Sequence, residues 1–420
     1  MAITGLLLSL FAIVLALHSC YGHPLKVCKF DQIYQVGDSI SDTGNLIRES
    51  PIGAATPFAR LPYGETFFKN ATGRCSNGLL MIDFLAMAAG LPFLNPYKNI
   101  DADFRHGVNF AVAGSTALPI EVLANQNISS PLTSSSLTVQ LDSMFTHFNS
   151  ICYTEKDCME KLKNSLFMVG EIGGSDYNYA LFQGKNINEV KEIVPSVIQA
   201  IKNAVRTVIH YGAVRVVVSG NFPIGCLPIY LTGFQTEDHA AYDENLCLKE
   251  LNSFSMYHNE RLQHAIEDLK IEFPNAVIVY GDYYNAFQWL FKNAPYRGFD
   301  AMSTKKACCG IGGDYNFSVT QMCGAPNVTV CSNPNQHISW DGVHLTQEAY
   351  KIMTGWLIHD FLPKLQCSWR LIGVGVVKVE VDGRGNGEIK ENGENEAMDM
   401  GGGFEVEIGW DSGAWGLGFW

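Results

Sequence analysis

Five short apolar segments, most of them ended by small or polar residues, alternate with longer amphipathic segments and restrict the folds that this chain can adopt. The apolar segments span residues 32–36, 108–112, 165–170, 214–218 and 276–280. Segments with helical character lie at 188–211, 242–273 and 346–365. Apolar strands that alternate with helices are typical of a parallel sheet covered on both faces. The sequence therefore predicts an α/β fold with a central parallel sheet of about five strands.

Small residues follow the first three of these predicted strands. Ser39 comes shortly after the first strand, Gly114 after the second and Ser175 after the third. Ligands of open parallel sheets bind beyond the carboxyl ends of the strands. We therefore expect Ser39, Gly114 and Ser175 to converge on one crevice.

Asp341 and His344 lie three residues apart near the other end of the chain. A nucleophilic serine needs a base within hydrogen-bond reach and a carboxylate that orients this base. One short loop can supply both groups if it folds back over Ser39. Taken singly, each residue has a structural explanation: Ser39 or Asp341 could cap a helix, and His344 could be a structural histidine. Their combination favours nucleophilic catalysis by Ser39.

Residues 1–22 have the pattern of a secretory signal peptide. Their apolar part, 6–17, is shorter than the about 20 residues that span a membrane, although a retained anchor is the alternative. No later segment is apolar for long enough to span, so we expect no stable membrane insertion. Acceptor motifs for N-glycosylation follow at Asn70, Asn127, Asn316 and Asn327. Together these features predict a secreted glycoprotein.

The cysteine content also favours an oxidising compartment. Of the 12 cysteines, one (Cys20) lies in the predicted signal peptide. Such a number predicts several disulfides, and an odd remainder leaves at least one thiol without a partner in the chain. Cys152 and Cys158 could close a small loop. A second cluster lacks the Cys-x2-Cys pair of zinc sites, so disulfides are favoured over a metal there; it contains Cys308, Cys309, Cys323 and Cys331.

The net charge is −13, and the last fifty residues, with ten acidic and three basic side chains, contribute −7 of it. An acidic chain without a basic patch is a poor ligand for nucleic acid and for anionic membranes. The acidic, Gly-rich segment 370–420 is expected to be a disordered tail. Residues 23–369 remain for one large α/β domain.

Four sequence blocks, in the same order, resemble the GDSL esterase/lipase family of SGNH-type hydrolases, in particular its secreted plant branch. The first block has Ile40 where the family usually has Leu. The resemblance covers residues 30–367, and the Gly-x-Ser-x-Gly motif of α/β-hydrolases is absent around the candidate serines. The blocks are residues 37–45, 109–114, 173–176 and 341–344.

This resemblance implies a flavodoxin-like three-layer α/β/α fold and an ester hydrolase that uses neither a metal nor an organic cofactor. Ser39 would attack the ester carbonyl, His344 would take the serine proton, and Asp341 would orient the imidazole. The oxyanion would be bound by the backbone N–H groups of Ser39 and Gly114. The family's third donor is an Asn side chain, and Ser175 stands in its place. Because one oxyanion donor is worth about 10²–10³ in rate, Ser175 implies compensation, slower catalysis or loss of hydrolysis, and we favour retained activity.

Segments 34–45, 63–67 and 171–179 are similar to plant members that deacylate specialised metabolites. They imply a small-molecule ester with a short acyl group, acetyl first, and an acyl-Ser39 intermediate. We expect a monomer that is secreted to the apoplast or carried to the vacuole. Two alternatives fit the same sequence: an acyltransferase with the same triad, and a catalytically weak secreted binding glycoprotein.

Further residues are assigned to the surroundings of this site. The acidic residues of the first and third blocks (Asp38, Asp42 and Asp176) are expected to accept backbone N–H bonds. Segment 222–228 is interpreted as a crevice wall, with core packing as an equal alternative. Tyr283, Tyr284 and Trp289 could line an acyl pocket, but aromatic core is the default.

Overall fold

Five parallel strands form the centre of the structure, a computed structural model that describes residues 23–367. Their order is β2-β1-β3-β4-β5, which is the flavodoxin-like order, so the predicted fold class is confirmed. The predicted signal peptide at 1–22 and the tail at 370–420 lie outside the described residues. The strands are β1 (Gln32–Val36), β2 (Gly107–Asn109), β3 (Ser165–Val169), β4 (Arg215–Ser219) and β5 (Val277–Gly281).

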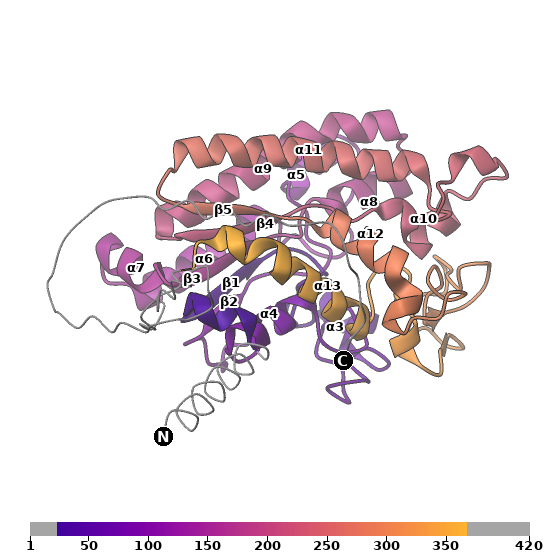
Figure 1. The fold of residues 1–420 in the computed structure, drawn as a ribbon, viewed down its shortest axis with the longest axis horizontal. Coiled ribbons are helices and arrows are strands. Elements are labelled where there is room, and N and C mark those ends of the chain that lie inside the picture. Colours follow the sequence, from indigo (N-terminus) through magenta and orange to yellow (C-terminus); the bar gives the residue numbers. More distant parts are fainter. Residues whose placement is uncertain (1–22, 368–420) are drawn as a thin grey trace, which may run out of the picture. The chain divides into compact units, whose positions relative to one another are not determined.

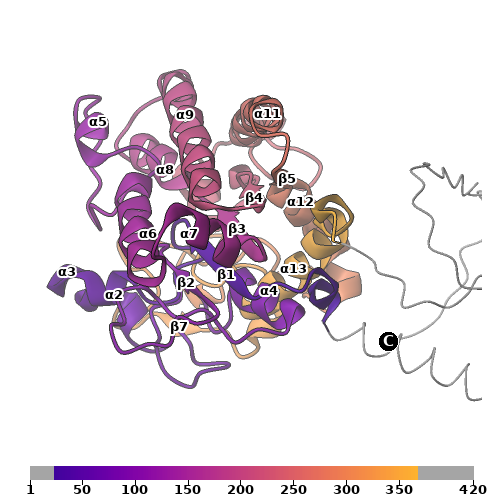
Figure 2. The ribbon, with the colours of Figure 1, turned by 90° about the vertical axis from the view of Figure 1, so that its left-hand side faces the viewer.

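Helices cover both faces of this sheet (Figures 1 and 2). One layer contains α6 (Leu137–Ile151), α9 (Ile187–Tyr211) and α11 (Lys249–Glu272), with α7 (Glu155–Leu162) and α8 (Gly174–Phe182) packed against α9. The other layer contains α4 (Met81–Ala89), α12 (Tyr283–Asn293) and α13 (Gln347–Phe361). Short helices are α2 (Leu46–Glu49), α3 (Pro51–Ala55), α5 (Ile120–Ala124) and α10 (Pro228–Gly233). A separate small sheet pairs β6 (Cys309–Gly310) antiparallel with β7 (Thr329–Val330). The 3-10 turns are η1 (Pro24–Cys28), η2 (Pro57–Ala59), η3 (Ile224–Cys226), η4 (His239–Ala241), η5 (Ala294–Arg297), η6 (Pro334–Gln336) and η7 (Pro363–Leu365).

The long helix α9 shows why the predicted periodicity succeeds. Asn186 and Glu189 form a capping box at its start, and Gly212 ends it in the left-handed conformation. Between them, apolar residues recur every three or four positions and are buried. One face of α9 therefore packs on the sheet, while Lys202 and Arg206 on another face pair with acidic side chains of α11.

Three predicted elements are shorter than expected. The closing helix predicted to residue 365 ends at Phe361, and the turn η7 follows it. The helix predicted from residue 242 begins only at Lys249, because the Asp243 carboxylate accepts the backbone N–H groups of Asn245 and Cys247 and closes a turn. The second strand ends at Asn109 instead of continuing to residue 112. Beyond it the N–H groups of Phe110 and Val112 still donate to the carbonyl oxygens of Gln35 and Gly37, but the Gly37 N–H donates to the Gln140 side chain and not to this segment, so the regular ladder ends.

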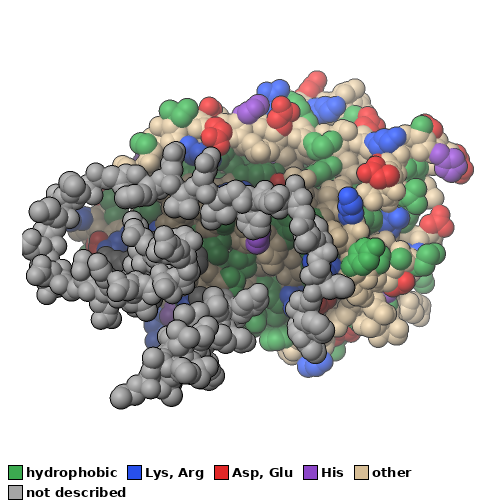
Figure 3. Space-filling view, viewed as in Figure 1, with side chains coloured by type: hydrophobic (Ala, Val, Ile, Leu, Met, Phe, Trp, Pro, Cys, Tyr) green, Lys and Arg blue, Asp and Glu red, His purple; other side chains and the backbone are tan. Residues whose placement is uncertain are grey.

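Charges of both signs are interspersed on the face seen in Figure 3, where Lys and Arg of the described residues form no single patch. Among residues 23–367, no helix is both long and apolar enough to cross a membrane.

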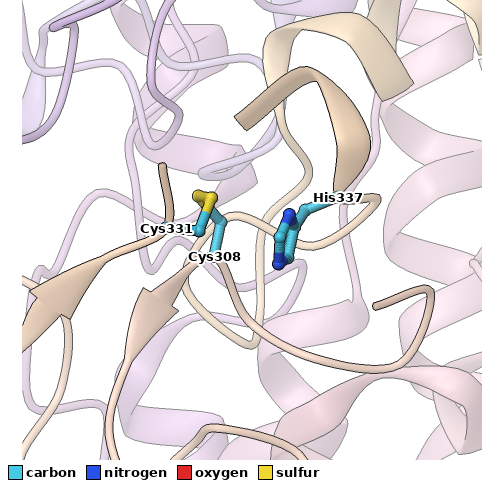
Figure 4. Close-up of side chains that lie close together, drawn as sticks. All are labelled: Cys308, Cys331 and His337. Atoms are coloured by element: carbon cyan, nitrogen blue, oxygen red, sulfur yellow. A yellow bond between two sulfur atoms is a disulfide. The ribbon is translucent and has the colours of Figure 1, made fainter. Parts of the chain in front are cut away.

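Five disulfides stabilise the described part of the chain. They include the predicted small loop, Cys152–Cys158, and they leave Cys75 as the one described cysteine that forms none. His337 lies beside the disulfide of Cys308 and Cys331 (Figure 4), with its ring and both sulfurs within 4.8 Å of one another. Because these sulfurs are bonded to each other, the cluster lacks the thiolates that a zinc ion would need. The remaining disulfides are Cys28–Cys367, Cys226–Cys247 and Cys309–Cys323.

The predicted glycosylation sites differ in accessibility. Asn70, Asn127 and Asn327 are exposed. Asn316 is half-buried, and its amide nitrogen donates to the carbonyl oxygen of Ala307 at 2.8 Å. Glycosylation of Asn316 would require loss of this hydrogen bond. Modification of all four residues stays a prediction.

The Cys28–Cys367 disulfide joins residues 339 positions apart and ties η1 to the segment after α13. Replacing both cysteines by Ser is expected to lower the free energy of unfolding by about 2–5 kcal/mol, because the unfolded chain gains conformational freedom. Urea unfolding would measure this change. The matched control replaces Cys152 and Cys158, which are only 6 positions apart, and should cost less. An equal or larger loss in the control would contradict the argument.

Candidate active site

The loop after β1 holds Ser39 at the edge of the sheet. Gln140 on α6 clamps its first residue: the side-chain oxygen accepts the N–H of Gly37 at 2.8 Å, and the amide nitrogen donates to the Gly37 carbonyl at 2.8 Å. Asp42 at the far end of the loop acts as a hub for four backbone N–H groups. They belong to Gly44, Asn45, Leu46 and Ala113, at 2.6–3.0 Å. The predicted role of Asp42 as a backbone acceptor is confirmed, and both ends of the serine loop are fixed.

The loop before α13 brings Asp341 and His344 back to Ser39. His344 Nε2 lies 2.8 Å from Ser39 Oγ, and His344 Nδ1 lies 2.7 Å from Asp341 Oδ2. The loop turns at Gly342, whose φ of +96° favours glycine and whose Cβ would meet the Phe317 ring. The structure thus brings together the three residues predicted for nucleophilic catalysis. Thr346, rather than Asp341, caps α13.

Asp341 is buried but well supplied with donors. Its Oδ1 accepts the backbone N–H groups of Val343 and His344 at 3.0 and 2.7 Å, and its Oδ2 also accepts the Tyr63 hydroxyl at 2.8 Å. Burial opposes ionisation, but the charge and N–H groups of His344 outweigh it and hold the pKa of Asp341 below its ordinary value. Asp341 is therefore an ionised acceptor for the His344 ring.

The expected convergence on one crevice is confirmed for Ser39 and Ser175, which line one cavity, but Gly114 is not part of the described lining. Each of these three residues carries a group that could donate to an oxyanion. The backbone N–H groups of Ser39 and Gly114 donate to no acceptor within residues 23–367, and neither does the Ser175 hydroxyl. Ser175 is buried on the first turn of α8 and lines the same cavity as Ser39. Tyr179, also on α8, donates to the Gly114 carbonyl at 2.9 Å and so links the two predicted oxyanion segments.

A small cavity of about 50 Å³ opens beside Ser39. Segment 222–228 supplies Phe222, Ile224 and Leu227 to its wall, so the crevice-wall interpretation is confirmed. The residues Tyr283, Tyr284 and Trp289 are not part of this lining. Tyr283 instead packs edge-on against the Phe222 ring in the core. The complete lining is Asp38, Ser39, Ile40, Glu171, Gly174, Ser175, Asn178, Phe222, Ile224, Leu227, Tyr230, Val343 and Leu345.

The comparison with known proteins agrees with this geometry. The family model described as GDSL-like lipase/acylhydrolase matches residues 33–357. The chain belongs to this family. Acetylajmalan esterase 1 of Rauvolfia serpentina is 48% identical over 346 residues, which are 82% of this chain and 90% of that protein. Acetylajmalan esterase 2 of the same species is 48% identical over 345 residues, covering 82% and 94%. A GDSL esterase/lipase of Arabidopsis thaliana is 45% identical over 347 residues, covering 82% and 94%.

As a member of this GDSL family, the chain is a carboxylic ester hydrolase that acts on small-molecule esters. Sequence analysis gave four residues of the site no role of their own: Tyr63, Gln140, Glu171 and Asn178. Three of them lie in segments 63–67 and 171–179, which resemble the metabolite deacylases, but that resemblance named no function for the single residues. The position of Glu171 gave a signal, because this residue directly follows the third predicted strand, and Asn178 lies one helical turn beyond Ser175. No spacing rule predicts the functions of Tyr63 and Gln140, since their partners are far away in the chain.

The hub function of Asp42 makes a stability prediction. In Asp42→Asn, one carboxylate oxygen becomes an NH₂ group that faces the N–H donors of Leu46 and Ala113. Loss of these charge-assisted bonds should lower the free energy of unfolding by about 2–4 kcal/mol. Urea unfolding followed by tryptophan fluorescence measures the effect. Asp101→Asn, at an exposed position without side-chain bonds within the described chain, is the matched control and should be neutral. A neutral Asp42→Asn would disprove the hub function.

Proposed function

We propose that this GDSL hydrolase is a secreted serine esterase that removes short acyl groups, acetyl first, through an acyl-Ser39 intermediate. The observation that carries the proposal is the hydrogen-bond chain Asp341–His344–Ser39, with 2.7 and 2.8 Å between successive partners. Both distances are within the range in which a base takes a proton directly. No step of this mechanism calls for a cofactor.

In the first half of the reaction, Ser39 Oγ bonds to the ester carbonyl carbon while His344 Nε2 takes the serine proton. Asp341 stabilises the imidazolium that forms. The oxyanion accepts the unengaged N–H groups of Ser39 and Gly114 and the hydroxyl of Ser175. The tetrahedral intermediate then expels the alcohol, which receives the proton from His344. Water attacks the acyl-enzyme with the same base, and release of the acid regenerates Ser39.

The size of the cavity and the relatives support a short acyl group. A volume of about 50 Å³ holds few non-hydrogen atoms, since one water molecule already needs about 10–15 Å³. Two of the relatives are named for esters of acetylated compounds, the acetylajmalan esterases. Five disulfides support passage through the secretory pathway.

Hydrolysis of p-nitrophenyl acetate, butyrate and laurate by the wild-type protein and by Ser39→Ala tests the proposal. We expect wild-type activity to fall from acetate to laurate, because the cavity is small. Ser39→Ala should retain less than about 10⁻³ of the activity, and a fluorophosphonate should label only the wild type. Equal activity of the two proteins, or no labelling, would refute a serine mechanism. Adding an alcohol acceptor and analysing the products reports any acyl transfer in the same assay.

Ser175 gives a second prediction. A carboxamide reaches further than a hydroxyl, so Ser175→Asn should supply a stronger third donor and raise kcat by about tenfold or more, with little change in KM. Steady-state kinetics with p-nitrophenyl acetate measure both constants. Ser175→Ala is the matched control and should lower kcat, because it removes the hydroxyl. If neither variant changes kcat, Ser175 is not an oxyanion donor.

A further inference from the structure

Glu171 is a buried acid beside Ser39 to which the esterase mechanism gives no task. It lies two residues after the end of β3 and lines the same cavity as Ser39 and Ser175. Its side chain is only 5% exposed, and its Oε2 has no hydrogen-bond partner within residues 23–367. Burying a carboxyl oxygen without a partner costs free energy. Oε1 forms no hydrogen bond within residues 23–367 either and, unlike the enclosed Oε2, is the Glu171 oxygen that can accept a contact from a ligand in the cavity.

A second carboxyl group lies close by. Asp38, which precedes Ser39, also lines the cavity and is 4% exposed. Glu171 Oε1 and Asp38 Oδ2 lie 3.2 and 3.8 Å from one point, the position that a Cβ would take on Gly174. One oxygen of Asp38 accepts the backbone N–H of Ile40 at 3.0 Å, as predicted from the sequence. The two carboxyl groups thus face the same space over a residue without a side chain.

The rest of the cavity favours a positive group. Neither Lys nor Arg occurs in the described lining, and most of the other side chains are apolar. Phe222 and Tyr230 add aromatic rings, whose faces attract cations. An apolar cavity with few converging polar groups is selective for ligands that match those groups.

We propose that Glu171, assisted by Asp38, binds a cationic nitrogen of the substrate, so that the enzyme prefers acetyl esters of amino alcohols. This inference rests on the proposed esterase function and names its substrate class. An acetyl group contains no charged atom, so the cationic nitrogen must belong to the alcohol part of the ester. Glu171 and Ser39 share one small cavity, which also has to admit the acetyl group, so only a small nitrogen group a few bonds from the ester oxygen fits there.

Protonation of the pair sets the pH dependence. Burial, and then the charge of Asp38, raise the pKa of Glu171 well above its usual range. Burial raises the pKa of Asp38 to about 7, against the Ile40 N–H and the charge of His344. A cation is attracted to the ionised form, so the preference should rise with pH through this range. The other titratable groups around the pair are Asp42, Cys75, Asp176, Tyr179, Tyr230, Tyr280, Tyr283 and Tyr350, none of which is basic.

The decisive experiment compares acetylcholine with 3,3-dimethylbutyl acetate, its neutral isostere. Since the charge of acetylcholine is permanent, a pH effect on the kcat/KM ratio of the two esters reports ionisation of the enzyme. Protonation of His344, the base in both reactions, lowers both kcat/KM values alike and so cancels in the ratio. The quaternary ammonium has no N–H, so the preference comes from charge attraction and contact with the aromatic rings; we expect a ratio of about 10–100 at pH 8, in the range of a desolvated cation contact, and a lower ratio at pH 6. A ratio of one or less at both pH values would overturn the proposal.

Glu171→Gln keeps the shape of the side chain and removes its charge. This variant should lower the ratio at least tenfold, whereas Glu192→Gln, an exposed position on α9, should leave it unchanged. A ratio that survives in folded Glu171→Gln contradicts the assignment. If this variant does not fold, the kcat/KM ratio of the wild type at pH 6 and pH 8 tests the proposal by itself.

A binding measurement separates failure of this inference from failure of the proposed function. Tetramethylammonium is titrated calorimetrically into Ser39→Ala and into the double variant Ser39→Ala/Glu171→Gln. We expect binding to the first that is at least tenfold weaker in the second. If the wild type hydrolyses neither ester but Ser39→Ala binds tetramethylammonium as expected, only the esterase proposal is refuted. Hydrolysis at Ser39 without binding of this cation and without a preference for acetylcholine refutes only the cation site.

Discussion

The parallel pairing of β1 with β3 places every part of this site. From these two neighbouring strands the chain continues in opposite directions across the sheet, from β1 to β2 and from β3 to β4, which leaves a crevice beyond their carboxyl ends. Ser39 follows β1, and Glu171 and Ser175 follow β3. The register from Gln32–Ser165 to Val36–Val169 holds the two strand ends level. A slip of one residue would turn every side chain of the slipped strand to the opposite face of the sheet, so core packing fixes the register and with it the position of the site.

The base comes from the other end of the domain and depends on polar contacts. Residues 341–344 meet Ser39 across 305 positions of sequence, and a buried hydroxyl from Tyr63 supports the carboxylate. Burial raises the pKa of Tyr63 well above its usual range, so this residue stays a donor. A buried carboxylate that accepts four hydrogen bonds remains ionised and fixed in orientation. This is what a histidine base needs from its partner.

Elements that depend on neighbouring residues could be predicted from the sequence. Contacts between residues far apart in the chain could not. Apolar runs identified all five strands, since a strand buried on both faces must be apolar throughout. The start of α11 was wrong because a turn around Asp243 replaces its first helical residues. Spacing and motif order brought Ser39, Asp341 and His344 into one hypothesis. Tyr63 and Gln140 were missed because their functions depend on residues 278 and 103 positions away.

The fold places two carboxyl groups, those of Glu171 and Asp38, beside the proposed oxyanion site, where their negative charge would oppose the reaction. A negative charge near the developing oxyanion would raise the barrier, most of all where Ser175 replaces a longer donor. Protonation of the Glu171–Asp38 pair removes part of this charge, and a cationic alcohol part neutralises it while bringing the ester to Ser39. In the second case the same contact serves binding and the transition state. The weak oxyanion donor and the acidic cavity are then two aspects of one specificity.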